Sequence, residues 1–392
     1  MMATVAPAAS LTSGTLEPGQ AEAQTTLTQP VQLPAQWSHP KTEARAVWIT
    51  SQELQESKEA LTAKLDQVAS ANFNTITVDT WFRGFVAYPD SALVPQYPGV
   101  VEKNPDVLSW ILKEAHARKL RVDAWPSYGF YAYYTKDAAA DESNGPLLDK
   151  HPDLTSLDAD GKAPLHNPSL GDFYSLCPAN PKSHQLLAQL ISEMVEKYEF
   201  DGVNLDRMRF PSSSYCHCAW CKEHFREDVG IELRRFPDGS EEARKFLEWK
   251  REQNARSIGV VHRAVRKLRP RMPITAYVVG PAEKDDKAQS WELWVKRGYI
   301  DAVAVSMYGP DIRETAKRAL QLLDGRKDKL ICAISCDLPH SSYYLRNIQF
   351  AREITPTGQF TWYGGKLLDD VEPLKAGPYA EPAAWPLLLS TK

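Results

Sequence analysis

The feature that most constrains the fold is a regular alternation of short apolar runs with segments whose apolar residues follow the helical period. Eight of the runs are predicted as strands, at Glu43–Thr50, Asn74–Asp79, Leu120–Trp125, Gly202–Asp206, Pro273–Val279, Ile300–Met307, Lys329–Ser335 and Gln359–Tyr363. Strands that alternate with helices form a parallel sheet, and eight such units predict an α/β fold closed into a (β/α)8 TIM barrel. A doubly wound open sheet is the alternative, but the regularity of the units favours closure.

Two of the intervening helices are marked most clearly. One is predicted to begin at Asn180-Pro181, a good N-cap followed by proline in the first turn, and the other to span about Glu241–Leu268. The connections from helix to strand are short. Those from strand to helix are long, at 81–104, 126–182 and 207–240. In a barrel these long loops build the active site, on the face where the strands end.

The predicted domain organisation is one barrel over 43–392, preceded by a disordered leader or linker over 1–42 that is rich in Ala, Thr, Pro, Gln and Ser. Residues 1–40 contain no Lys or Arg, so no signal peptide is recognisable there. We therefore expect that the protein stays inside the cell, or that its signal was lost or lies upstream of Met1. No apolar run approaches the ~18 residues that cross a bilayer, so no transmembrane segment is expected.

Charge and motifs narrow the class of function. The formal net charge of −4 argues against a general nucleic-acid binder, which needs a basic excess to neutralise phosphates. The glycines form neither a G-x-G-x-x-G pattern nor a P-loop, so no nucleotide cofactor is expected. The nine histidines are scattered, and neither H-E-x-x-H nor G-x-S-x-G is present. We expect a neutral or weakly charged ligand and no cofactor.

Three of the six cysteines lie together in the run Cys216-His-Cys-Ala-Trp-Cys221. This spacing is similar to that of a metal knuckle, but a closed zinc site takes four ligands, usually as two spaced pairs. His217, His224 or the distant Cys177 is available as a fourth ligand. The prediction is that the three cysteines are reduced thiols in a surface loop, without a metal ion. A structural metal or a local disulfide is the alternative.

Polar and aromatic side chains gather where the predicted strands end, at Asp79, Asp123, Trp125, Asn204, Asp206, Arg207, Tyr277, Ser306, Tyr308, Asp311, Ser335, Asp337, Trp362 and Tyr363. Such side chains are costly in a core but natural in a barrel's site. Because residues alternate along a strand, Asn204 and Asp206 are expected to share the inward face. Arg207 and Arg209 are expected to keep Asp206 ionised, as a glycosidase nucleophile or base must be. A buried Asp–Arg pair that only closes the barrel is the alternative.

Cleavage of a glycosidic bond normally takes a second carboxyl group as general acid. Asp79, Asp123, Asp311 and Asp337 qualify by position. Asp311 is chosen because it lies in a loop that begins at a strand end. The same side chain fits equally well as the cap of a helix that starts near Ile312.

Aromatic residues crowd the loops after the second and third strands, at Trp81, Phe82, Phe85, Tyr88, Trp125, Tyr128, Phe130, Tyr131, Tyr133 and Tyr134. Flat apolar faces with polar edges suit sugar rings. About a third of these residues, with Trp81 and Trp125 among them, are predicted to contact a ligand in a loop-lined pocket. The others are expected to pack the loops onto the barrel.

A family resemblance is carried by Glu43-Ala-Arg-Ala-Val-Trp-Ile-Thr50, His116–Trp125, Leu176-Cys-Pro-Ala-Asn-Pro181, Asp201-Gly-Val-Asn-Leu-Asp-Arg-Met-Arg-Phe-Pro211, Trp249–Asn254, Trp291–Gly298 and Met307-Tyr308. In order and spacing these stretches resemble the glycosyl-hydrolase-like TIM-barrel family, a family-10-like group of formerly unknown function. That group includes a divisome-associated hydrolase of peptidoglycan glycan strands, and many of its members are exported. Here Arg207 stands where an aromatic residue is more usual, and the 216–221 run is not general to the family.

The resemblance implies a TIM barrel that hydrolyses glycosides, with Asp206 in the site and Arg45 and Trp48 lining the barrel near it. The resulting hypothesis is a cofactor-independent glycoside hydrolase. Its substrate class, a bacterial cell-wall or exopolysaccharide glycan, and a cell-envelope or extracellular location are implied by the resemblance alone. One rival is a carbohydrate-binding barrel without turnover, which would lack two carboxylates at roughly 5–10 Å. Another is a metal-dependent hydrolase that uses Asp79, Asp123 or the cysteines.

Overall fold

Eight parallel strands form a closed barrel in the order β1-β13-β12-β11-β10-β9-β5-β2, which confirms the predicted fold class. The structure, a computed structural model, describes residues 29–136, 143–168, 170–362 and 364–386. The barrel strands are β1 (Ala44–Ile49), β2 (Thr75–Asp79), β5 (Arg121–Trp125), β9 (Gly202–Leu205), β10 (Ile274–Val278), β11 (Ala302–Met307), β12 (Leu330–Ser335) and β13 (Gly358–Trp362). Each lies within two residues of its predicted bounds.

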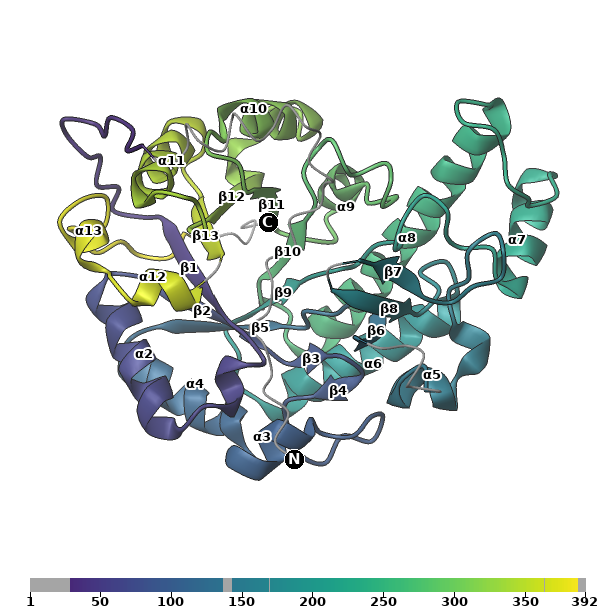
Figure 1. Ribbon diagram of the computed structural model, residues 1–392, viewed down its shortest axis with the longest axis horizontal. Coiled ribbons are helices and arrows are strands. Elements are labelled where there is room, and N and C mark those ends of the chain that lie inside the picture. Colours follow the sequence, from purple (N-terminus) through teal and green to yellow (C-terminus); the bar gives the residue numbers. More distant parts are fainter. Residues whose placement is uncertain (1–28, 137–142, 169, 363, 387–392) are drawn as a thin grey trace.

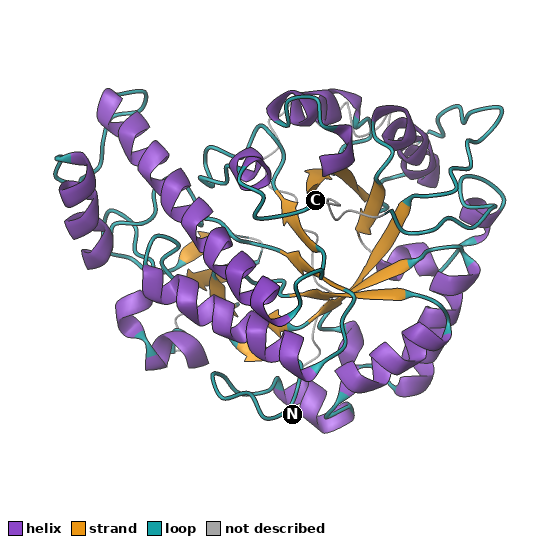
Figure 2. Cartoon of the chain, turned by 180° about the vertical axis from the view of Figure 1, so that it is seen from behind, coloured by secondary structure: helices purple, strands orange, loops and turns teal. Residues whose placement is uncertain are grey.

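Helices surround the barrel, as Figures 1 and 2 show. They are α2 (Lys58–Ser70), α3 (Pro98–Lys103), α4 (Val107–Ala117), α5 (Pro146–Lys150), α6 (Pro181–Lys197), α7 (Ala219–Val229), α8 (Glu241–Leu268), α9 (Trp291–Lys296), α10 (Arg313–Leu322), α11 (Ser341–Ile354), α12 (Gly364–Leu368) and α13 (Glu372–Lys375). Both clearly marked helices are confirmed. The side chain of Asn180 accepts a hydrogen bond from the backbone N–H of Lys182, so it caps α6 as predicted.

Strand alternation divides the apolar residues into two cores. In β1, Val47 and Ile49 face outward and pack with the helices, whereas Ala46 and Trp48 face the inside of the barrel. The inner core consists mostly of alanines with a few large rings. Small side chains fill the lower part of the barrel. Aromatic side chains lie near its top, where the strands end.

The long loops contain two small sheets that the sequence analysis did not predict. One pairs β3 (Trp81–Phe82) with β4 (Phe85–Val86). The other has the order β6-β8-β7, formed by Tyr131–Thr135, Gly171–Ser175 and Leu165–Asn167. Strands such as Tyr131–Thr135 and Gly171–Ser175 contain few of the aliphatic residues that mark most of the barrel strands. Figure 1 shows the second sheet between the barrel and α7, on the side where β9 ends.

The predicted leader over 1–42 falls largely on residues 1–28, which lie outside the described residues. Within 29–42, the backbone N–H of Val31 donates to the hydroxyl of Ser342, and Arg352 donates to the carbonyl oxygen of Ser38. This segment therefore contacts α11. Among the helices that the structure describes, none is long and apolar enough to cross a membrane.

Candidate active site

A cleft of about 590 Å³ opens where the barrel strands end. The barrel strands and the residues that follow them contribute Trp48, Trp125, Asp206, Arg207, Arg209, Tyr277, Val279, Gly280, Pro281, Ala282, Glu283, Lys287, Ser306, Met307, Tyr308, Gly309 and Trp362. The sheet β6-β8-β7 adds Tyr131, Leu165, His166, Asn167 and Phe173, and α10 adds Thr315 and Arg318. A cleft of this size suits a small molecule or part of a chain molecule.

Asp206 follows β9 directly and is only 3% exposed. The indole nitrogen of Trp125 donates to its Oδ2 at 3.1 Å, and the backbone N–H of Arg207 donates to its Oδ1. Burial raises the pKa of this carboxyl above its ordinary value, while Arg207 and Arg209 act in the opposite direction. The arginines were expected to dominate, but loss of hydration outweighs them.

Close packing of two loops shapes the backbone around Asp206. Gly129, in the loop after β5, lies so near that a Cβ there would collide with the carbonyl oxygen of Asp206. Arg207 has a positive φ of 45°, its Nη1 donates to the carbonyl oxygen of Ser127 at 2.7 Å, and its guanidinium lies 5.0 Å from the ring centre of Tyr128. Arg207 therefore ties the β9 loop to the β5 loop, in addition to placing a positive charge beside Asp206.

Aromatic rings form the floor of the cleft. The ring centres of Trp48 lie 6.1 Å from Trp125, 5.6 Å from Tyr277 and 5.7 Å from Trp362. The hydroxyl of Tyr277 donates to that of Tyr308 at 2.7 Å. The indole nitrogen of Trp48 is buried and has no hydrogen-bond partner among the described residues. Rings with polar edges around a buried carboxylate suit the apolar faces and hydroxyls of a sugar.

Asp79, at the end of β2, lies behind Asp206 and does not line the cleft. It is 3% exposed, and its Oδ2 accepts a hydrogen bond from the backbone N–H of Ser51 at 3.2 Å. Burial raises the pKa of Asp79 to about 8, and the charge of Asp206 contributes in the same direction. At neutral pH Asp79 is therefore mainly neutral.

Asp311, the predicted general acid, is not among the residues that line the cleft. Its carboxylate accepts hydrogen bonds from the side chain of Arg313 and, at 3.0 Å, from the backbone N–H of Arg313. This guanidinium lowers the pKa of Asp311. The structure thus places Asp311 just before α10, where it pairs with Arg313, while the N-cap position itself is Ile312 and has no side-chain cap. A general acid must also reach the glycosidic oxygen, and Asp311 does not line the cleft.

Arg45 lies at the opposite end of the barrel from the cleft. It is on the outer face of β1, where it donates to Glu43 Oε2 at 2.7 Å and to the carbonyl oxygen of Glu381 at 2.7 Å. Side chains three positions apart on a strand point to opposite faces, so Arg45 and Trp48 cannot both face the interior. The structure brings Trp48 to the cleft and leaves Arg45 in a buried ion pair.

Other predicted site residues also lie outside the cleft lining. Asp123 is inside the barrel, below Trp125, in an ion pair with Arg121 at 2.7 Å. Asn204 does face inward, and it donates to the hydroxyl of Thr275 at 2.8 Å. Asp337 follows β12, and its backbone N–H donates to Ser335. Tyr363 lies outside the described residues.

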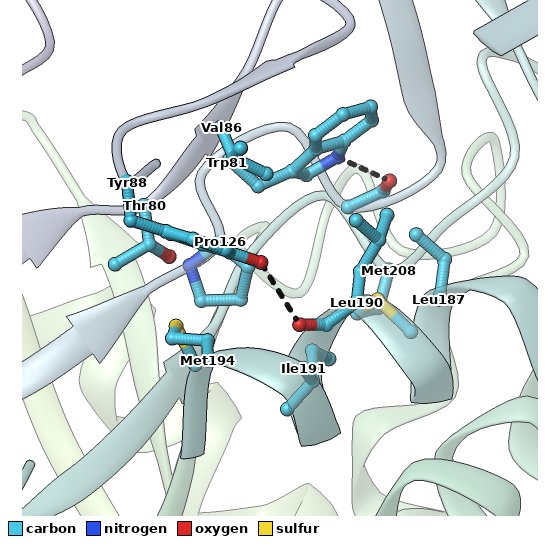
Figure 3. A pocket seen from close by; sticks show the side chains of 11 residues that line it. Thr80, Trp81, Val86, Tyr88, Pro126, Leu187, Leu190, Ile191, Met194 and Met208 are labelled. Carbon is cyan, nitrogen blue, oxygen red and sulfur yellow. Dashed lines mark hydrogen bonds between the residues drawn. The ribbon is translucent and has the colours of Figure 1, made fainter. Parts of the chain in front are cut away.

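Trp81 lines a separate small cavity of about 10 Å³, shown in Figure 3. Its indole nitrogen donates to the carbonyl oxygen of Gly129 at 3.1 Å. Across the cavity, the hydroxyl of Tyr88 donates to the backbone carbonyl oxygen of Leu190. The remaining walls are largely aliphatic side chains of α6. A space this small holds one water molecule at most, so this is a packing gap. Trp81 fixes loops here and does not line the cleft.

Comparison with known proteins identifies the family of this chain. The sequence profile of the family described as Glycosyl hydrolase-like 10 matches residues 43–337, which include every barrel strand except β13. The chain belongs to this family. Its strand-four segment, with Asp206, and the strand ends that form most of the cleft lie within the matched region.

Relatives of this glycosyl hydrolase-like chain include the protein named glycosyl hydrolase DigH in Escherichia coli (strain K12) and in Shigella flexneri. Each is 23% identical over 288 residues, which is 66% of this chain and 60% of the relative. The chain thus spans about 60% of the length of these curated relatives.

Solved structures with a similar fold include two from other bacteria. The PgaB (BpsB) glycoside hydrolase domain from Bordetella bronchiseptica has a TM-score of 0.59 at 12% identity, covering 85% of this chain and 98% of that one. The catalytic domain of β-amylase from Paenibacillus polymyxa has a TM-score of 0.61 at 12% identity, covering 84% and 94%. At this identity the likeness establishes the shared barrel.

Within this glycosyl hydrolase-like barrel, several cleft residues were not predicted as site residues. Glu283 lies in the loop after β10, and besides Asp206 it is the one acidic residue among the described residues that line the cleft. The pattern of strand ends does not mark Glu283, because this residue lies in the loop beyond the end of β10 at Val278. His166 and Phe173 reach the cleft through the sheet β6-β8-β7, whose strands contain few aliphatic residues.

Proposed function

We propose that this protein hydrolyses glycosidic bonds, with Asp206 as the nucleophile or the base. The observation that carries the proposal is the position of Asp206, a buried carboxylate at the floor of an aromatic cleft that accepts hydrogen bonds from Trp125 and from the backbone of Arg207. Donors aimed at a carboxylate stabilise its charged form and fix its orientation. Membership of a glycosyl hydrolase-like family supports the same class of reaction.

The second carboxyl group in the proposal is Glu283. It lines the same cleft as Asp206, and it comes from the neighbouring strand's loop, since β10 pairs with β9. As general acid, Glu283 would transfer its proton to the glycosidic oxygen while the bond from that oxygen to the anomeric carbon breaks. Asp206 would either remove a proton from the attacking water or attack the anomeric carbon itself. In the second case an ester forms, which water cleaves with Glu283 as the base, and Asp206 is released. The spacing between the two carboxyls determines whether the anomeric configuration is retained or inverted.

Asp79 is proposed as a positioning residue behind Asp206. With a pKa of about 8, it is neutral at neutral pH and adds no second negative charge beside the reacting carboxylate. Two adjacent carboxylates would raise each other's pKa, and a nucleophile or base must be ionised. A neutral Asp79 therefore allows Asp206 to ionise despite its burial.

The proposed substrate is a glycan that carries carboxylate groups, as bacterial cell-wall strands do. Arg209, Lys287 and Arg318 line the cleft together with Arg207, against the two acidic groups Asp206 and Glu283. Nε of Arg209 is buried and lacks a hydrogen-bond partner among the described residues, and its guanidinium lies 6.0 Å from the ring centre of Tyr131. A guanidinium placed in this way fits a carboxylate of the substrate through paired hydrogen bonds.

The test is turnover by the wild-type chain, Asp206→Asn and Glu283→Gln on peptide-free peptidoglycan strands, chitin oligomers, and α- and β-linked glucans, with products identified by mass. We expect cleavage of the acidic glycan, and a loss of at least ~10³-fold in kcat/KM for folded Asp206→Asn. For Glu283→Gln we expect a loss of ~10²-fold or more, smallest on substrates with a good leaving group that needs no protonation.

Asp311→Asn serves as the matched control, because it removes a carboxylate outside the cleft. Full activity of folded Asp206→Asn would exclude this mechanism. Binding of a glycan by the wild-type chain without cleavage would favour the rival, a carbohydrate-binding barrel. Arg209→Met is expected to weaken cleavage of the acidic glycan more than that of a neutral one.

A further inference from the structure

The four cysteines nearest the β9 loop converge in space. Cys177 precedes α6, whereas Cys216, Cys218 and Cys221 lie between β9 and the first turn of α7. Their sulfur atoms all lie within 4.8 Å of one another, with Cys177 Sγ 3.4 Å from Cys221 Sγ and 3.6 Å from Cys218 Sγ. We call these residues the four-cysteine cluster. All four are buried, so the prediction of surface-loop thiols is wrong. In the folded chain Cys177, which is distant in sequence, is the fourth cysteine of the cluster.

The spacing of the sulfur atoms matches that of a single tetrahedral metal site. A zinc–sulfur bond of about 2.3 Å places the sulfurs of a regular tetrahedron about 3.8 Å apart. The observed separations, from 3.4 Å to no more than 4.8 Å, bracket this value. A tetrahedral set of four sulfur ligands is typical of zinc or of iron–sulfur centres, and a cluster of several irons would hold its thiolates farther apart.

The surroundings suit a buried metal–thiolate centre. The cluster is packed among apolar side chains that include Phe210, Phe225 and Trp249. Four thiolates around one divalent ion leave a net charge of −2, which is costly in such a place unless positive groups lie nearby.

Two positive groups lie near the four-cysteine cluster and would offset this negative charge. Lys250 is 2% exposed, and its ammonium donates to the carbonyl oxygens of Ser213 and Tyr215, the latter next to Cys216, at 2.8 Å each. The 11-residue helix α7 has Cys218 as its N-cap and Cys221 in its first turn, so its positive dipole end faces this charge. A lysine buried in an apolar cluster is itself expensive; Asp286 is one anion near it, and thiolates of the cluster would be others.

We propose that the four-cysteine cluster holds one structural zinc ion, which ties together two of the loops that build the cleft. With four protein ligands the site is closed, so the ion has no open position for a substrate. One loop is the β5–α6 connection, which contains β6, β7 and β8 and supplies Tyr131, His166 and Phe173 to the cleft. The other follows β9 and supplies Arg207 and Arg209.

Backbone hydrogen bonds also connect these two loops. The N–H of Cys177 donates to the carbonyl oxygen of Leu154, and the N–H of His217 to that of Leu157, both at 2.7 Å. Residues 154–157 are thus bonded on one side to the chain before α6 and on the other to the loop before α7. A zinc ion would add a strong link at the point where these segments meet, as structural zinc does in small folds.

The test is the metal content of the purified full-length chain, measured by elemental analysis and by native mass spectrometry. We expect about one zinc per chain, released by a mercurial that blocks thiols, and uptake of Co²⁺ by the reduced apoprotein with intense cobalt–thiolate absorption. Cys218→Ser should lose the metal. Cys332→Ser is the matched control, because Cys332 is buried in β12 away from the cluster, and it should keep one zinc per chain.

Several results would overturn the proposal. A reduced chain that contains no zinc and takes up no Co²⁺ would exclude the site, and so would full zinc occupancy in Cys218→Ser. A non-reduced mass lower by two or four hydrogens would show disulfides instead, and stoichiometric iron would replace zinc as the ion. If Cys218→Ser does not fold, mercurial release from the wild-type chain still decides. None of these measurements depends on the proposed catalytic role of Asp206.

Discussion

The indole nitrogen of Trp125 donates a hydrogen bond to Oδ2 of Asp206 at 3.1 Å, joining the ends of two adjacent strands, β5 and β9. This bond makes Trp125 part of the cleft's floor and also a determinant of the charge on Asp206, because donation to a carboxylate lowers its pKa. The same contact orients the carboxylate toward a ligand on the aromatic floor.

Trp125→Phe should therefore slow the reaction and shift its pH dependence. Loss of a hydrogen bond to a charged group costs about 1.5–3 kcal/mol, so kcat/KM is expected to fall ~10–100-fold. The pKa of Asp206 should rise, which moves the acid limb of the pH profile of kcat/KM to higher pH. Trp362→Phe is the control, since it alters the floor without touching this bond. An acid limb that stays in place in Trp125→Phe would contradict the assignment of that limb to Asp206.

The buried carboxyl of Asp79 should make stability depend on pH. Its pKa is about 8 in the folded protein and near 3.8 when unfolded, so the folded state binds the extra proton between these values. The stability from this group is complete below about pH 4 and is lost as the pH rises toward 8. Asn cannot ionise, so the free energy of unfolding of Asp79→Asn relative to wild type should rise by at least about 1 kcal/mol between pH 4 and pH 8.

Urea denaturation of both proteins at several pH values measures this difference. Asp311→Asn is the control, because the pKa of Asp311 is lowered and its removal should give no such rise. A difference between Asp79→Asn and wild type that does not change with pH would show that Asp79 ionises normally in the folded protein.

Arg45 is expected to affect stability and not catalysis. Arg45→Met removes the donor to Glu43 and to a backbone carbonyl in a fully buried site, although Arg352 still neutralises Glu43. We expect a loss of about 2 kcal/mol or more in the free energy of unfolding. The kcat/KM of the folded fraction should remain within about 2-fold of wild type. A large loss of activity with unchanged stability would place Arg45 in the site, as the family resemblance implied.

Asp311→Asn should leave kcat/KM within about 2-fold of wild type, because its carboxylate is held by Arg313 at the start of α10. Both partners are largely exposed, at 37% and 53% of their side chains, so the stability loss should stay below about 1 kcal/mol. Steady-state kinetics and thermal denaturation measure the two quantities. A ~10²-fold loss of activity would restore Asp311 as the general acid.

The fold could be predicted from sequence because its signals are local. A strand such as Ala302–Met307 is marked by its own apolar run, and α6 by Asn180-Pro181 at its start. The position of Asp206 could be predicted in the same way, since a strand end in a parallel barrel necessarily lies on the face with the long loops. The rings of Trp125, Tyr277 and Trp362 were predicted by this rule too, whereas Trp48 was implied by the family resemblance.

Choosing among the carboxylates needed information that no local pattern contains. Asp79 and Asp311 both lie at or beyond a strand end, yet one is buried behind Asp206 and the other is paired with Arg313 at a helix start. Whether a carboxyl gains or loses protons depends on burial and on neighbours from other elements. Glu283 could not be predicted as a cleft residue from strand ends, because its loop, and not its strand, brings it to the cleft.

The sequence by itself determined the eight strands, their closure into a barrel and the face that carries the site. Periodicity and strand ends can be recognised from residues that are adjacent in the sequence. Only the tertiary structure decided that Cys177 meets Cys216, Cys218 and Cys221, and that the sheet β6-β8-β7 forms a wall of the cleft. These contacts join segments that are distant in sequence. Their formation depends on how the long loops pack over the barrel, which no single segment specifies.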